Sequence, residues 1–181
     1  PNIGNNEILR LIPIGGVGDV TKNMYVYEYG SDIIIVDCGV GFPDEGMLGV
    51  DLVIPDISYL RDKKDKIKAI LITHGHDDHI GGLPYIWPEL QVPIYTQKLT
   101  AGFIKGKFTE HNLPKNKVID VGINETLDLG VFKVSFYQVA HSIPDSTGIV
   151  IRTPVGTIIH QAEFKIDWTP PSGQTTDVSR A

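Results

Sequence analysis

The chain has 181 residues, of which 41% are hydrophobic and 21% charged, and its formal net charge is -6. This length predicts a single domain with a substantial core, which we place over residues 1–181. The negative charge is the wrong sign for a protein that holds nucleic acid by charge alone. No apolar run approaches about 18 residues, and no signal peptide is visible at the N-terminus, so we expect no contact with a membrane. A single cysteine, Cys38, excludes an internal disulfide and fits a cytoplasmic location.

Short strands broken by glycine and proline dominate the sequence, with a few helices between them. Strands are predicted over residues 8–14, 24–30, 33–36, 68–74, 92–96, 117–121, 132–141, 147–153 and 156–161. Helices are predicted over residues 57–64, 82–90 and 98–111. The run Ile33–Val36 is continuously apolar, which is typical of a strand buried on both faces. This order of elements predicts layered sheets covered by helices, an α/β (α+β) fold.

Polar side chains recur at the carboxyl ends of the apolar strands. Asp37 follows one strand, His74 ends a second, His141 ends a third and His160 lies at the end of a fourth. In sheet proteins with helical layers, sites are built at that edge. We therefore expect a functional site where these strand ends meet.

The segment THGHDDHIGG is the strongest motif, with three histidines and two aspartates within six residues. In an extended chain, alternate residues point to one side, so His74, His76 and Asp78 can converge while Asp77 points away. His79 then lies where the chain turns at the following glycine pair. Imidazole and carboxylate groups at this density suit zinc or another borderline divalent ion. The alternative, a surface loop that is merely polar, does not explain the buried strand that leads into it.

The number of candidate ligands exceeds what one zinc ion needs, which is three protein ligands and a water. His141 and Glu163 add two candidates to those of the motif. The surplus argues for two metals, about 3.5–4 Å apart, which can hold a bridging hydroxide between them. The chemistry that this arrangement suggests is hydrolysis.

Other polar groups have weaker claims. Asp37 is expected to orient a ligating histidine and fix its tautomer, and the alternative is a turn or cap residue. Cys38 is expected to be a buried, inert thiol, and His111 a surface residue. The basic side chains of residues 61–68 and 98–117 form either a solvated face or a rim that faces phosphates.

The sequence HGHDDH resembles the His-x-His-x-Asp-His signature of the metallo-β-lactamase fold. Four longer segments are similar to bacterial ribonuclease J, of the β-CASP branch: IGGVGDVTKNMYVYEY, VDCGVGFPDEGMLGVDLVIPDISYL, ILITHGHDDHIGGLPY and VAHSIPDS. The resemblance implies a four-layer αβ/βα sandwich. It also implies a phosphodiesterase that cuts RNA from the 5′ end and internally by a metal-activated hydroxide. The implied cofactor is Zn²⁺, two ions per chain, with Mn²⁺ or Mg²⁺ as alternatives.

The resemblance also implies roles for particular residues. Six positions match metal ligands, which are His74, His76 and His141 for one metal, Asp78 and His79 for the other, and Glu163 as the bridge. Asp37 matches the first motif of the family, whose aspartate contacts the metal ligands and not the metal itself. Asp37, Asp78 and His79 are the residues expected to take part in catalysis.

The chain departs from the family at the bridging position. The family usually reads His-Thr-Gly-Asp-Phe-Lys where this chain has HQAEFK, so the bridge is Glu163 instead of Asp. One extra methylene moves the carboxylate by roughly an angstrom, whereas metal–ligand distances tolerate only about ±0.2 Å. Either the loop retracts, or the second metal is weakened. We expect the site of His74, His76 and His141 to persist and the second to be weak.

The chain ends near the place where the β-CASP insertion begins in the family. We therefore expect an N-terminal portion of the metallo-β-lactamase domain, without that insertion, whose open sheet face seeks a second copy or a complementing C-terminal half. RNA is the expected substrate partner. Two alternatives stay open: another hydrolase of the same fold, acting on a thioester, lactone or β-lactam, and a non-catalytic metal-binding or assembly fragment.

Overall fold

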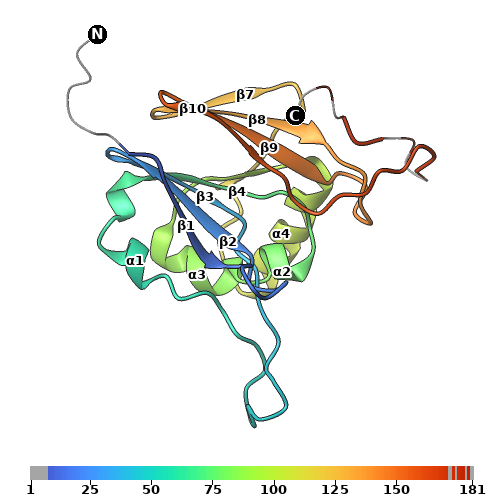
Figure 1. Cartoon of the computed structure of the whole chain (residues 1–181). Coiled ribbons are helices and arrows are strands. Elements are labelled where there is room, and N and C mark those ends of the chain that lie inside the picture. Colours follow the sequence, from blue (N-terminus) through green and yellow to red (C-terminus); the bar gives the residue numbers. More distant parts are fainter. Residues whose placement is uncertain (1–7, 171–172, 174, 178, 180–181) are drawn as a thin grey trace.

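Two β-sheets lie face to face, and the helices lie on the outer side of the first sheet, as the computed structural model in Figure 1 shows. The structure describes residues 8–170, 173, 175–177 and 179. The first sheet has the order β1 (Arg10–Gly15), β2 (Met24–Tyr29), β3 (Asp32–Val36), β4 (Ile67–Leu71), β5 (Ile94–Thr96) and β6 (Val118–Asp120). The second has the order β10 (Gly156–His160), β9 (Thr147–Thr153), β8 (Phe132–Gln138) and β7 (Thr126–Leu129).

The first sheet is mixed, and the second is antiparallel. Strands β1, β2 and β3 pair antiparallel, whereas β3, β4, β5 and β6 pair in parallel. Parallel neighbours need long crossover connections, which here contain the helices. These are α1 (Ser58–Arg61), the 3₁₀ turn η1 (Lys64–Lys66), α2 (Asp77–Ile80), α3 (Leu83–Leu90) and α4 (Lys98–Glu110).

Strand β3 is buried on both faces, as its continuous apolar run predicts. Ile33 and Ile35 pack into the core beneath the helices, and Ile34 and Val36 pack into the core between the two sheets. The mixed α/β class is confirmed. Of the four expected layers, the residues that the structure describes form three, which are helices, first sheet and second sheet.

Some boundaries differ from the prediction. The helix predicted over residues 57–64 is only one turn long, followed by η1, and β7 was not predicted at all. β7 is four residues long and mostly exposed, so its pairing with β8 and not an apolar pattern defines it. Helix α4 continues through its two glycines because buried side chains such as Ile104 and Phe108 hold it on the sheet. No helix in the described part of the chain is long and apolar enough to cross a membrane.

Candidate metal centre

The histidine-rich segment is extended only as far as His76. Strand β4 ends at Leu71, the chain continues in an irregular stretch, and α2 begins at Asp77. The alternation predicted through Asp78 is therefore wrong beyond His76, because Asp77 and Asp78 occupy the first turn of a helix. Asp77 nevertheless points away, and its Oδ1 lies 2.6 Å from Lys107 Nζ.

The glycine pair that follows has a different role from the predicted one. Gly81 and Gly82 have φ angles of -66° and -76°, which any residue adopts. A Cβ on Gly82 would lie 2.6 Å from the carbonyl oxygen of Gly39, and a Cβ on Gly39 would lie 1.6 Å from that of Asp78. The glycines therefore allow α2 to lie directly against the backbone that follows β3.

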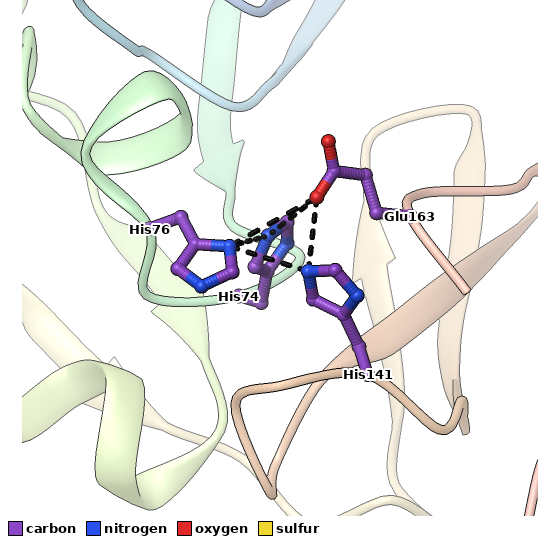
Figure 2. A group of neighbouring side chains, drawn as sticks. All are labelled: His74, His76, His141 and Glu163. Atoms are coloured by element: carbon purple, nitrogen blue, oxygen red, sulfur yellow. Dashed lines mark hydrogen bonds and ion pairs between the residues drawn. The ribbon is translucent and has the colours of Figure 1, made fainter. Parts of the chain in front are cut away.

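Four side chains from distant parts of the chain converge on one point (Figure 2). His74 Nε2 lies 3.0 Å from His76 Nδ1, which lies 3.2 Å from His141 Nε2. Glu163 Oε2 lies 2.9 Å from His141 Nε2, 3.7 Å from His74 Nε2 and 3.9 Å from His76 Nδ1. A tetrahedron with bonds of 2.0–2.1 Å, as zinc forms with nitrogen and oxygen, has edges of about 3.3–3.4 Å. The observed separations scatter around that length, so the donor set fits a single tetrahedral divalent ion.

Hydrogen bonds orient the rings of His74 and His76. Thr73 Oγ1 lies 2.9 Å from Asp37 Oδ2 and 3.0 Å from His74 Nδ1. If the Thr73 hydroxyl donates to Asp37, it accepts from His74 Nδ1–H, which leaves the Nε2 lone pair facing the centre. Burial lowers the pKa of His74 to about 3, so this imidazole is neutral at physiological pH. Ser142 Oγ lies 3.1 Å from His76 Nε2, so the other nitrogen of that ring faces the centre.

A second group lies beside the first and shares Glu163 with it. Its members, Asp78, His79 and Glu163, have ligand atoms within 4.8 Å of one another. His79 Nε2 lies 3.4 Å from Asp78 Oδ2, and His79 Nδ1 lies 2.8 Å from Asp37 Oδ2. Burial opposes the charged form of His79, but the Asp37 and Asp78 carboxylates together outweigh it and raise the pKa of His79 to about 10.

Asp37 is a support for both groups. Its side chain is 1% exposed, and its backbone φ of 62° lies in the left-handed region that few residues other than glycine adopt. Its carboxylate accepts hydrogen bonds from the backbone and the hydroxyl of Thr73 and lies against His79. Burial would raise the pKa of Asp37, but the neighbouring His79 lowers it, so the carboxylate stays ionised. This geometry supports the predicted orienting role, and strain of this kind is typical of functional sites.

Asn23 is a buried site residue that the sequence analysis did not identify. Its side-chain nitrogen lies 3.2 Å from His79 Nε2 and 3.3 Å from Asp78 Oδ2. Its backbone N–H also donates to the Asp78 carbonyl. The only signal in the sequence is a polar residue directly before the apolar strand β2.

Glu163 reaches both groups because its loop folds back onto the strand end that carries His141. The backbone N–H of Lys165 donates to Ala140 O at 2.8 Å, and the Tyr137 hydroxyl donates to Gln161 Oε1. These bonds hold the loop on either side of Glu163, whose side chain is 45% exposed. These bonds fix the backbone from which the side chain of Glu163 extends to both groups.

His160 does not join either group. Its Nδ1 lies 2.9 Å from the Tyr27 hydroxyl, and its ring packs edge-on against Tyr25. It lines a cavity of about 530 Å³ that also touches Asn23 and Glu163. Of the four polar groups predicted to meet at the strand ends, His160 is therefore part of the wall of this cavity and belongs to neither donor group.

The weaker candidates lie as predicted. Cys38 is buried, and burial raises the pKa of its thiol, which keeps it protonated and unreactive. His111 is exposed and packs edge-on against Tyr85.

Several basic side chains of the two lysine-rich stretches have acidic partners within the chain. Lys63 pairs with Glu28 at 2.9 Å, and Lys68 pairs with Asp32 at 3.0 Å. These partners favour an ion-paired surface at residues 61–68. The alternative, a rim that faces phosphates, stays a prediction for the basic groups outside such pairs.

The sequence matches the Metallo-beta-lactamase superfamily over residues 17–160, which is more than half of the chain. The chain belongs to this superfamily. Ribonuclease J of Thermus thermophilus is 41% identical over 185 residues, covering 98% of this chain and 32% of that protein. Ribonuclease J2 of Bacillus subtilis is 44% identical over 176 residues, covering 96% of this chain and 32% of that protein. The resemblance to ribonuclease J is confirmed, and the chain spans about a third of the length of these curated relatives.

Solved structures share the metallo-β-lactamase fold with this chain. A protein of unknown function from Enterococcus faecalis V583 has a TM-score of 0.67 at 20% identity, covering 87% of this chain and 44% of that one. The metallo-beta-lactamase fold protein YhfI from Bacillus subtilis has a TM-score of 0.59 at 20% identity, covering 84% of this chain and 62% of that one. At such identities the likeness concerns the fold alone.

Proposed function

We propose that this chain is the metal-binding part of a ribonuclease J-type phosphodiesterase that hydrolyses RNA from the 5′ end and internally. The observation that carries the proposal is the pair of donor groups that share Glu163, on a chain more than 40% identical to two ribonucleases over nearly its whole length. Other hydrolases of the superfamily have no comparable support here.

One set of residues would bind the metals, and Asp37 orients two of these ligands. His74, His76 and His141 would hold one metal, Asp78 and His79 a second, and Glu163 both. Asp37 orients His79 directly and His74 through the Thr73 hydroxyl. When bound, the ions would polarise a phosphodiester and activate water for its hydrolysis. The donor chemistry favours Zn²⁺, two per chain, with Mn²⁺ or Mg²⁺ as alternatives.

The remaining expectations belong to the same proposal. The residues implied for catalysis are Asp78 and His79, with Asp37 as their support. The chain would form part of a larger assembly, with a second copy or with a complementing C-terminal half. The lone buried thiol of Cys38 supports a reducing compartment, the cytoplasm.

The test is RNA cleavage by the metal-loaded protein. The purified chain would be incubated with Zn²⁺ or Mn²⁺ and a 5′-monophosphorylated, 3′-labelled RNA. The assay would be run with the chain alone and with the unmatched part of the Thermus thermophilus ribonuclease J supplied in trans. We expect mononucleotides and internal fragments, lost at least 100-fold in His141→Ala and retained in the matched surface variant Asp120→Asn. No cleavage in either arrangement by metal-loaded protein, or turnover of a thioester, lactone or β-lactam instead, would overturn the proposal.

A further inference from the structure

One face of helix α4 touches both segments that carry the candidate ligands. Thr100, Phe103 and Lys107 follow one another at spacings of three and four residues, so they lie along one side of the helix. Each meets a residue next to or near a candidate ligand, and the partners come from two segments far apart in the sequence. The neighbouring face of the helix, with Ile104 and Phe108, is buried in the core.

The first contact caps the N-terminus of α4. Thr100 donates to Asp145 twice, from its backbone nitrogen to Oδ2 and from its hydroxyl to Oδ1, each at 3.0 Å. The preceding Gln97 makes no capping bond with its side chain, so this function passes to Asp145 from another segment. A carboxylate at a helix N-terminus is favoured by the exposed N–H groups and the helix dipole. Asp145 lies four residues after His141, so this contact anchors the turn that carries His141.

The second contact holds the chain between His74 and His76. A Cβ on Gly75 would lie 2.5 Å from Phe103 Cδ2, so the aromatic ring lies directly against the Gly75 backbone. A residue with a side chain at position 75 would force either the ring or the segment to move. The glycine of the HGHDDH motif is therefore explained by its contact with α4.

The third contact is the ion pair of Lys107 with Asp77, at 2.6 Å. Asp77 lies between His76 and Asp78. Its side chain is 59% exposed, and exposed pairs contribute little, so this contact is the weakest of the three.

We infer that α4 is a positioning element for the metal centre, and that Asp145 is its principal positioning residue. The inference rests on the proposed metal-binding function. Helix α4 sets the His74–Asp78 segment and the His141 turn relative to each other, because Phe103 and Lys107 contact the first segment and Thr100 contacts the second. Because metal–ligand distances tolerate only about ±0.2 Å, a small relative shift of the two segments weakens binding.

The experiment compares Asp145→Asn and Thr100→Val with two controls. Thr100→Ser keeps the hydroxyl, and Asp120→Asn removes an exposed partner of Lys105 on the same helix. Zn²⁺ affinity would be measured by competition with a chelator, the coordination geometry by the visible absorption of Co²⁺-loaded protein, and the fold by the melting temperature of metal-free protein.

We expect Asp145→Asn and Thr100→Val to weaken Zn²⁺ binding about 10-fold and to change the Co²⁺ spectrum, while both controls match the wild type. If Asp145→Asn does not fold, Thr100→Val, which removes only one of the two hydrogen bonds, makes the same comparison. A lowered melting temperature with wild-type affinity and spectrum would reduce Asp145 to a purely structural cap and overturn the inference. Failure of the wild type to bind any metal would instead overturn the proposed function.

Discussion

The substitution Glu163→Asp tests whether the loop after β10 is positioned for the longer side chain of Glu. Removing one methylene retracts the carboxylate by about 1 Å or more, since a C–C bond is about 1.5 Å long. Glu163 Oε2 now lies 2.9–3.9 Å from the three histidine nitrogens, around the edge of about 3.3–3.4 Å that a tetrahedral zinc site requires. A retraction of 1 Å exceeds the tolerance of about ±0.2 Å several-fold.

The loop cannot easily follow the shorter side chain. It is tied on one side of Glu163 by the Tyr137–Gln161 hydrogen bond and on the other by the Lys165–Ala140 backbone bond. We therefore expect Glu163→Asp to weaken metal binding about 10- to 100-fold, which is about 1.4–2.8 kcal/mol. The second metal should suffer most, because its group keeps only Asp78 and His79, whereas the first keeps three histidines.

The assay is a Zn²⁺ titration against a chelator, with the number of bound ions measured after gel filtration. Glu163→Gln is the matched control, because it keeps the length and removes the charge. It should weaken both sites by the loss of charge. If Glu163→Asp binds two ions as tightly as the wild type or more tightly, the loop adapts, and the argument from its fixed backbone is refuted.

Three further predictions concern the same centre. His141→Ala should remove most metal binding, because it deletes one nitrogen ligand of the first group, which is also the nearest partner of Glu163. If elemental analysis finds an unchanged number of metal ions per chain, the assignment of His141 as a ligand is wrong. Gly39→Ala should lower the melting temperature of metal-free protein by several degrees, because its Cβ would lie 1.6 Å from Asp78 O and overpacking of this kind costs about 1–3 kcal/mol. An unchanged melting curve would contradict this close approach. Because His79 has its pKa raised from 6.5 to about 10, its stabilising charge is fully present below pH 6.5 and lost as pH rises towards 10. The melting temperature of metal-free protein should fall across that window, and Asp37→Asn should flatten the fall; equal slopes in both proteins would argue against the His79–Asp37 pair.

The features that the sequence predicts well are those that local pattern controls. The apolar run of β3 predicts its burial on both faces, and the density of histidine around His76 predicts a group of candidate ligands whose separations fit a tetrahedral divalent ion. Helix α4 was also predictable, although Gly102 and Gly106 interrupt it, because its apolar positions keep the helical period.

The features that were missed depend on contacts between distant segments. Asn23 meets Asp78 and His79, which lie more than 50 residues further along the chain. Asp145 meets Thr100 across 45 residues. Neither contact leaves a periodicity that a single sequence displays. The helical turn at Asp77 was missed because four residues are too few for an amphipathic pattern to appear.

The position of Glu163 follows from how the two sheets meet. In the first donor group, His74 and His76 come after a strand of the first sheet, while His141 and Glu163 come after strands of the second. The packing of Ile34 and Val36 against the second sheet therefore sets the distance between the two halves of the site. The departure from Asp to Glu lies in the exposed half of the site, on a loop whose backbone is tied to the second sheet. His74, in contrast, is fully buried. A longer side chain at position 163 therefore has open space beside it, whereas a longer side chain at position 74 would have to displace buried neighbours.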